Sequence, residues 1–266
     1  MADTGQVTST AAEFYDAFFV PALFEEWPAR LVAAARLAPG MRIVDVACGT
    51  GVLTSEAAEA VCPGGTAVGI DVNPGMLAVA RRKADAVEWH EAAAESLPFE
   101  AGVFDAVLSQ FGLMFFVDKE AALREMWRVL RPGGRLVVAV WGLLEDAPGY
   151  AAVTSLLGTL FGDSLADLLR SPYSLGDPRV LRALLVEAGV PEPEIRQVAG
   201  TARFPSIRAW IECDIRGWTL ADKLDDAQFE FLVSEAENQL SRFVRSDGSV
   251  EFAHPALIAG ATKLAG

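Results

Sequence analysis

Between residues 41 and 141 the chain alternates short apolar runs with helical segments. Of all the sequence features, this alternation restricts the possible folds most strongly. The apolar runs are rich in Val and are separated by turns that contain Gly or Pro. Strands are predicted at 41–47, 66–72, 86–91, 103–110 and 135–141, and helices at 51–61, 74–84 and 119–130. Apolar runs of this length are typical of buried parallel strands, and the helices between them make the return crossovers. The pattern therefore predicts an α/β fold on a parallel sheet.

The segments on either side of this core are mainly helical in pattern. Apolar spacing predicts one helix around residues 12–19 and a second from about Pro21 to Leu37. Further along, helices are expected at 148–170 (broken near Gly162), 177–188, 206–217 and 225–243, a sixth strand within 189–204, and a last strand within 250–263. Asp177 is placed to cap the helix that it precedes.

Neither a repeat nor a linker composition divides the chain, so we expect one domain over residues 1–266. Within it, residues of about 40–142 form the core. The flanking segments 1–38, 142–175 and 205–246 then form a helical cover and insertions over one end of the sheet.

Composition excludes several functional classes. The net charge of −14 opposes binding to nucleic acid. The run Leu136–Leu144 has about half of the ~20 residues that a membrane helix needs, so a membrane span is not expected. Three cysteines and two histidines without ligand spacing argue against a metal site. The N-terminus does not resemble a signal peptide, and we expect a cytoplasmic protein with reduced thiols.

The strongest local signal is a glycine-containing turn at the junction of the first predicted strand and helix. It reads Val44-Asp45-Val46-Ala47-Cys48-Gly49-Thr50-Gly51, and Asp71 stands at the end of the second strand. Glycines let the backbone approach a ligand, and exposed N–H groups at a helix start attract a negative group. A carboxylate at the position of Asp71 accepts hydrogen bonds from ribose hydroxyls. Together these features predict a cleft for a nucleoside-containing cofactor.

Two cofactor classes fit such a cleft. A dinucleotide site favours a third glycine, where this chain has Thr54. The ordered segments DVACGTG, GIDVNPGML, AESLPF, FDAVLSQFGLMFF and EMWRVLRPGGRLVVAVW resemble the motifs of class I S-adenosylmethionine-dependent methyltransferases, in particular the ubiquinone/menaquinone-biosynthesis-type small-molecule branch. The resemblance covers residues of about 40–142. It implies a Rossmann-like, doubly wound, mostly parallel seven-stranded sheet.

The resemblance also implies roles for individual residues. Those near the methionine part of the cofactor would be Asp45, Ala47, Gly49 and Gln110, and Gly51 of the same turn would also belong to the cofactor site. Asp71 would bind the ribose, and Val72 and Met76 would lie against the adenine. Many relatives have an acid at the position of Ala93 that bonds the adenine amino group. Its absence here assigns that role to Ala94, Glu95 or another residue.

The expected reaction is in-line attack of a small-molecule nucleophile on the methyl of S-adenosylmethionine, for which alignment and desolvation suffice. The sequence singles out neither a catalytic base nor the attacking atom. Aromatic residues outside the core predict a hydrophobic or aromatic acceptor, and they are Phe161, Tyr173, Trp210 and Trp218. The alternatives are changed chemistry on the same scaffold (a hydroxylase, decarboxylase or cyclase), a non-catalytic partner subunit and, last, a nicotinamide oxidoreductase.

Three further features have a structural interpretation as the first choice. Cys48 and His254 are expected to pack rather than react. The apolar stripe from Phe229 to Phe243 is expected to be core, with a homodimer interface or a substrate wall as the alternatives.

Overall fold

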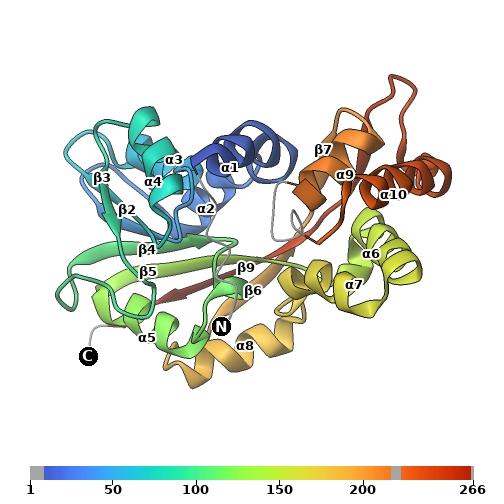
Figure 1. Cartoon of the computed structure of the whole chain (residues 1–266). Coiled ribbons are helices and arrows are strands. Elements are labelled where there is room, and N and C mark those ends of the chain that lie inside the picture. The colour runs from blue at the N-terminus through green and yellow to red at the C-terminus, as the bar shows by residue number, and fades with distance from the viewer. Residues whose placement is uncertain (1–8, 217–222, 265–266) are drawn as a thin grey trace.

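The computed structural model describes residues 9–216 and 223–264, and a seven-stranded sheet lies at its centre (Figure 1). The strand order is β3-β2-β1-β4-β5-β9-β6, and only β9 runs antiparallel to its neighbours. The strands are β1 (Arg42–Val46), β2 (Thr66–Asp71), β3 (Glu88–Glu91), β4 (Phe104–Gln110), β5 (Leu130–Trp141), β6 (Glu194–Val198) and β9 (Ala256–Thr262). The mostly parallel, seven-stranded prediction is confirmed.

Helices cover both faces of this sheet, as a doubly wound fold requires (Figure 1). On one face lie α2 (Pro28–Ala35), α3 (Val52–Val61) and α4 (Pro74–Lys83), and on the other α5 (Lys119–Val129) and α8 (Pro178–Glu187). The side chains of Asn73 and Asp177 accept hydrogen bonds from the first backbone N–H groups of α4 and α8. The adjacent strands β1 and β4 are mostly apolar and buried because helices cover both faces of the sheet there.

The N-terminal cover differs from the prediction in its boundary. α1 (Ser9–Phe14) continues without a break into the π-helix η1 (Tyr15–Phe24), so Pro21 lies inside a helix and does not begin one. Pro21 has no N–H to donate within the helix. The π-helical pattern of hydrogen bonds between residues five apart continues to Glu25, whose N–H donates to the carbonyl of Val20. The second helix begins instead at Pro28, which occupies the first-turn position that proline favours.

The last two predicted strands are each divided in two. The segment 189–204 forms β6 and then β7 (Thr201–Phe204), and the C-terminal segment forms β8 (Val250–Ala253) and then β9. β7 and β8 pair in a separate antiparallel sheet. His254 and Pro255 separate β8 from β9. The prediction that His254 lies within the last strand is therefore wrong. Proline lacks the N–H that a ladder needs, and the N–H of His254 bonds the carbonyl of Gly200.

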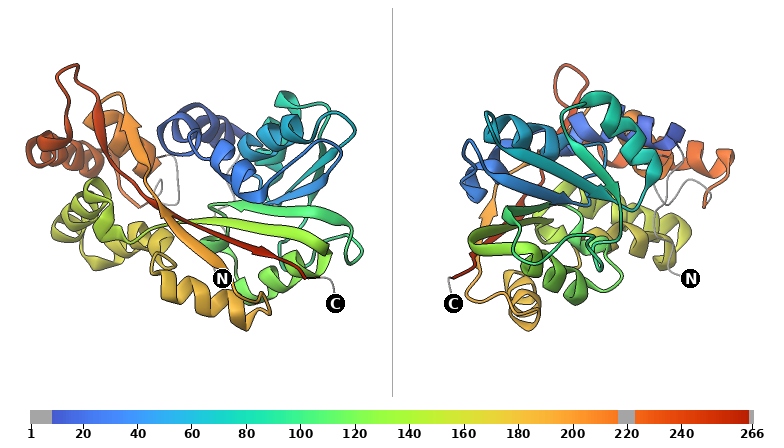
Figure 2. Two further views of the ribbon diagram at one scale, coloured as in Figure 1. Left: turned by 180° about the vertical axis from the view of Figure 1, so that it is seen from behind. Right: turned by 90° about the vertical axis from the view of Figure 1, so that its left-hand side faces the viewer.

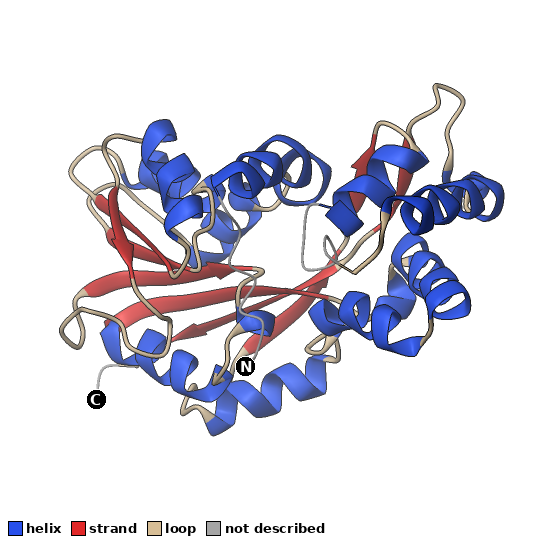
Figure 3. Cartoon of the chain, in the orientation of Figure 1, coloured by secondary structure: helices blue, strands red, loops and turns tan. Residues whose placement is uncertain are grey.

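The remaining helices gather around this small sheet, beyond one end of the large one (Figures 2 and 3). They are α6 (Pro148–Phe161), α7 (Asp163–Arg170), α9 (Ile207–Arg216) and α10 (Asp226–Gln239). Short turns occur at η2 (Leu113–Phe115), beside β5 and α5, and at η3 (Leu144–Asp146), η4 (Ser171–Tyr173) and η5 (Ser241–Phe243). On α10, Phe229, Leu232 and Val233 are buried, so the predicted stripe is core. None of the described helices is long and apolar enough to cross a membrane.

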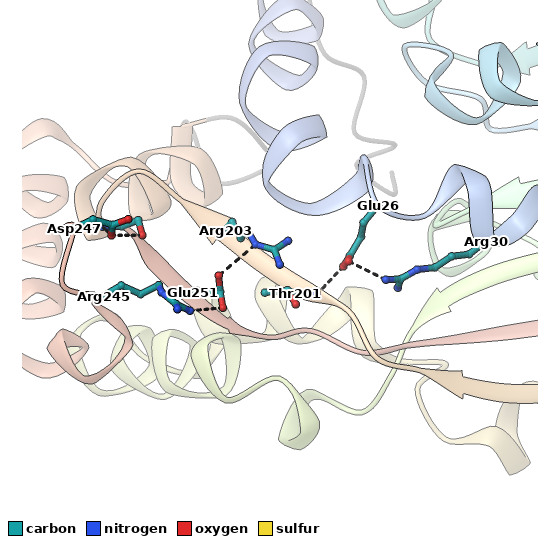
Figure 4. A network of polar contacts seen from close by, with 8 residues as sticks. Glu26, Arg30, Thr201, Arg203, Arg245, Asp247 and Glu251 are labelled. Carbon is teal, nitrogen blue, oxygen red and sulfur yellow. Dashed lines mark hydrogen bonds and ion pairs between the residues drawn. The ribbon is translucent and has the colours of Figure 1, made fainter.

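A polar contact ties the N-terminal cover to the small sheet (Figure 4). The carboxylate of Glu26 accepts from the backbone N–H of Thr201 at 2.6 Å and from the guanidinium of Arg30 at 3.0 Å. Arg30 also donates to the carbonyl of Ala199 at 2.6 Å. The segment that joins η1 to α2 is therefore fixed against the start of β7.

Candidate active site

The glycine-containing turn leaves the carboxyl end of β1 in a left-handed backbone conformation. The φ angles are 61° at Ala47, 54° at Gly49 and 82° at Gly51. A Cβ on Gly51 would lie 2.6 Å from the ring of Trp89, so glycine is required there for space as well as for conformation. The turn thereby brings its backbone to the surface of a pocket.

This pocket, the turn pocket, lies between the glycine turn and the N-terminal cover. It is lined by Tyr15, Val20, Phe24, Asp45, Ala47, Cys48, Gly49, Thr50, Val52, Leu53 and Gln110. Four of the predicted cofactor residues, Asp45, Ala47, Gly49 and Gln110, thus meet at one site. Cys48 is buried, and burial raises the pKa of its thiol well above the usual range, as expected for a packing residue.

Asp45 is the buried acid of the turn pocket. The hydroxyl of Thr54 donates to its Oδ2 at 2.6 Å, whereas its Oδ1 has no hydrogen-bond partner among the described residues. Burial is the main cause that raises the pKa of Asp45 to about 7. A buried carboxylate oxygen without a partner is costly, and a cationic amine in the pocket would both bond it and favour its charge.

Asp71, at the end of β2, supports the glycine turn from the next strand. Its two oxygens accept from the backbone N–H groups of Gly49 and Asn73, each at 2.8 Å. Burial, as the largest cause, raises the pKa of this carboxyl. Each carboxylate oxygen has two lone pairs, so both can accept a further hydrogen bond from a ligand.

The residues expected beside the adenine are only partly brought together. Val72 and Met76 follow Asp71, and the side chain of Val72 is exposed. Ala94 is buried. Glu95 Oε1 accepts from the backbone N–H groups of Val117 and Asp118, so its carboxylate holds the loop before α5.

A second cavity, the aromatic cavity, lies on the other side of η1. Its volume is about 110 Å³, and it is lined by Tyr15, Phe19, Leu23, Phe24, Phe111, Phe115, Trp141, Tyr150, Leu169, Pro172, Tyr173, Asp214 and His254. Tyr15 and Phe24 line both the aromatic cavity and the turn pocket. The two sites are therefore neighbours that share one wall.

One wall of the aromatic cavity is a stack of three rings. The ring centroid of Trp141 lies 3.7 Å from that of Phe111 and 3.8 Å from that of His254, with nearly parallel planes. Phe111 has a φ of 56°, an uncommon value for an aromatic residue, directly after β4. Phe111 directly follows β4, and Ala47 directly follows β1, the neighbouring strand. Doubly wound sheets bind ligands at the carboxyl ends of such strands.

The aromatic cavity also contains two buried polar pairs. Tyr150 donates to Asp214 Oδ1 at 3.1 Å, and the Tyr173 hydroxyl lies 3.0 Å from His254 Nε2. Asp214 Oδ2 has no hydrogen-bond partner among the described residues. Burial raises the pKa of Asp214 to about 7 and lowers the pKa of His254 to about 3, so the imidazole is neutral.

Sequence reasoning missed several of these residues. Thr54 was interpreted only as a missing glycine, although it bonds Asp45. Asp214 shares a buried helical stripe with Ile207, Trp210 and Ile211, and a carboxylate within such a stripe is the signal that was available.

Of the four aromatic residues expected near the acceptor, one lines the aromatic cavity. Tyr173 lines the aromatic cavity, whereas Phe161 and Trp210 do not. Trp210 is fully buried beneath Tyr150 and Phe252. Trp218 lies outside the described residues.

Comparisons with known proteins show the family to which the chain belongs. Residues 44–138 match the family model described as a methyltransferase domain. The chain is 40% identical over 178 residues to the demethylmenaquinone methyltransferase of Thermus thermophilus, covering 61% of this chain and 80% of the relative. It is 34% identical over 179 residues to a ubiquinone/menaquinone biosynthesis C-methyltransferase of Shewanella frigidimarina, covering 61% and 71%.

A solved structure shares the fold. The phosphoethanolamine N-methyltransferase 2 of Haemonchus contortus, in complex with S-adenosylhomocysteine, aligns with a TM-score of 0.62 and 20% identity. The alignment covers 98% of this chain and 58% of that one.

The chain belongs to the class I S-adenosylmethionine-dependent methyltransferases of the ubiquinone/menaquinone type. It is an enzyme that transfers a methyl group from S-adenosylmethionine to a small-molecule acceptor, and its Rossmann-like sheet is the one that the motifs predicted. The turn pocket fits this cofactor, because the partnerless oxygen of Asp45 suits an ammonium group and the left-handed glycine turn gives an open backbone surface.

Proposed function

We propose that the turn pocket and the aromatic cavity are the two halves of one active site. In this proposal Asp45, Ala47, Gly49 and Gln110, which line the turn pocket, hold the methionine part of S-adenosylmethionine, and Gly51 permits the turn that presents them. Asp71 holds the ribose, with Val72, Met76, Ala94 and Glu95 on the adenine side. The observation that carries the proposal is the shared wall, because Tyr15 and Phe24 line both sites and so place a cofactor and an acceptor next to each other.

The acceptor in this proposal is a hydrophobic, aromatic compound. The lining of the cavity is mostly aromatic, and its volume is of the same order as the ~150 Å³ of an engineered apolar cavity that binds benzene. About one ring can therefore enter the site. Relatives named for ubiquinone and menaquinone biosynthesis support a ring compound as the acceptor.

The cofactor supplies a methyl group that is already activated by a positively charged sulfur. The protein has to position the acceptor and exclude water. The apolar walls and η1 exclude water from the cavity, and the aromatic side chains that line it can pack against an aromatic acceptor. Residues of about 40–142 bind the cofactor in this scheme, and residues 1–38, 142–175 and 205–246 form the acceptor region of the same domain.

Titration calorimetry tests the cofactor half. We expect binding of S-adenosylmethionine and S-adenosylhomocysteine but not NADH, weakened at least about tenfold by Asp71→Ala because the ribose and Gly49 both lose an acceptor. Asp71→Asn keeps one acceptor oxygen and should be intermediate. Binding of NADH alone would overturn the proposal.

Two variants on α7 test the acceptor half. Leu169 lines the aromatic cavity, whereas the adjacent Leu168 does not. We expect Leu169→Phe to fill the cavity and to lower affinity for toluene, while Leu168→Phe leaves it unchanged; both should bind S-adenosylmethionine normally. Equal toluene affinity in the two variants would show that the acceptor binds elsewhere.

A homodimer and a cytoplasmic location remain predictions. Light scattering on the purified protein tests the homodimer.

A further inference from the structure

We propose that Asp214 is the catalytic base that takes the proton from a hydroxyl group on the aromatic acceptor, which makes the acceptor a phenol or hydroquinone. This inference rests on the proposed function, since it requires the acceptor in the aromatic cavity. Asp214 lies on α9, outside the residues that match the methyltransferase family model.

The first argument is the unused hydrogen-bonding capacity of Asp214. The residue lines the cavity and is 2% exposed, its Oδ1 is bonded by Tyr150, and its Oδ2 lacks a partner among the described residues. The indole N–H of Trp210, one turn earlier on α9, forms no hydrogen bond of normal geometry either, although it lies close enough to Asp214 to lower the pKa of the carboxyl in part. Natural proteins rarely keep a buried carboxylate oxygen in this condition unless a ligand or water completes it. A hydroxyl group is a suitable ligand because it donates to an acceptor oxygen.

The second argument comes from the groups that surround Asp214. Tyr150 on α6, Tyr173 on η4, Tyr15 on η1 and Cys213 on α9 all have raised pKa values because they are buried, so each is neutral near pH 7. His254, before β9, is neutral because burial lowers its pKa to about 3. Among the residues that the structure describes, no cation on these elements shifts the pKa of Asp214. Asp214, with a pKa of about 7, is therefore the group of this set that exchanges a proton near neutrality.

The chemistry of the step is a simple proton transfer. The O–H bond of the acceptor breaks, the proton forms a bond with Asp214 Oδ2, and the acceptor oxygen keeps the electron pair. The phenolate that results carries the electron density for attack on an electrophilic methyl. Tyr150 keeps the carboxyl group in place through its bond to Oδ1, and it acts as a positioning residue.

Binding of phenol and toluene, which differ only in the hydroxyl and methyl substituents, tests the inference without turnover. We expect wild type to bind phenol about tenfold more tightly than toluene, and Asp214→Leu to lose this preference while it still binds toluene. Asp214→Glu should restore part of it. Phenol affinity of wild type should rise with pH through about 7, as Asp214 ionises, whereas that of Asp214→Asn should not change.

The outcomes separate this inference from the proposed function. Equal affinities of wild type for phenol and toluene, or the same pH dependence in Asp214→Asn, would overturn the role of Asp214 only. If wild type bound S-adenosylmethionine but neither ring compound, the aromatic cavity would not be the acceptor site, and both would fall. Melting temperatures of the variants identify any that fail to fold. Tyr150→Phe keeps the carboxyl group but removes the bond that positions it, so it should retain only part of the phenol preference.

Discussion

At the scale of single residues, the proposed contact of Asp45 with the cofactor is expected to make binding depend on pH. Its pKa of about 7 in the free protein means that it is mostly protonated at mildly acidic pH. Because a cationic amine favours the ionised form, we expect the affinity for S-adenosylmethionine to rise about tenfold from pH ~5.5 to pH ~7. Calorimetry in buffers of different ionisation enthalpy should detect proton release. Asp45→Asn should bind more weakly, without this pH dependence.

The same pKa has the opposite effect on the stability of the unliganded protein. A carboxyl whose pKa is higher in the folded than in the unfolded chain holds a proton in the folded state between pH ~4 and pH ~7. Its contribution to stability therefore falls as pH rises through this window. The raised pKa of Asp214 changes the stability with pH in the same direction. We expect urea denaturation of Asp45→Asn to show a smaller fall than wild type, and an equal fall in both would contradict the raised pKa.

Ala47 has a left-handed backbone conformation that an alanine tolerates poorly. Strain of about 1–2 kcal/mol in a non-glycine residue is offset in part by the ~0.5–1 kcal/mol entropy cost of glycine, so Ala47→Gly should stabilise the fold by about 0.5–1 kcal/mol. The exposed Ala33 in α2 is the control, and Ala33→Gly should destabilise by about 1 kcal/mol. Destabilisation by Ala47→Gly in urea melts would show that the methyl group packs usefully.

At the scale of elements, the N-terminal cover depends on Glu26 for its attachment to β7. Glu26→Ala leaves the N–H of Thr201 without its acceptor and should cost about 1 kcal/mol. We expect faster amide hydrogen exchange in residues 15–30 and weaker toluene binding, since η1 forms part of the cavity wall. Glu26→Gln keeps an acceptor for Thr201 but loses the charge beside Arg30, and it should behave almost like wild type. Identical exchange in the alanine variant would refute the attachment.

At the scale of the whole molecule, the net charge of −14 is expected to oppose the compact state. Screening of this repulsion by NaCl should raise the melting temperature by about 2–4 °C, on the order of 1 kcal/mol. Chloride is preferable to sulfate, which would strengthen apolar burial as well. A melting temperature that fell with NaCl would mean that local ion pairs outweigh the overall repulsion.

Local sequence determined the core of the fold and half of the site. Apolar runs, turn residues and caps act over a few neighbours, so β1 to β4 and α3 to α5 were predictable nearly to their ends. β5 begins at Leu130, earlier than the predicted 135, because the residues of the expected turn belong to the strand. The glycine turn with Asp71 predicted a nucleoside-containing cofactor, and the resemblance of the ordered motifs identified it as S-adenosylmethionine. Pro21 and the break at Pro255 were predicted less well, because one proline can begin, interrupt or lie within an element according to what packs around it.

Only the tertiary structure decided the aromatic cavity, which is the proposed acceptor half of the site. Its residues come from the ends of β4 and β5 and from segments as far apart as η1, α6, α9 and the residues before β9. No spacing in the sequence links Tyr150 to Asp214 or Tyr173 to His254. The same holds for their ionisation, since the pKa of Asp214 is raised by burial that distant segments create. Sequence neighbours specify backbone conformation and cofactor motifs, whereas a cavity and its electrostatics depend on which remote side chains meet.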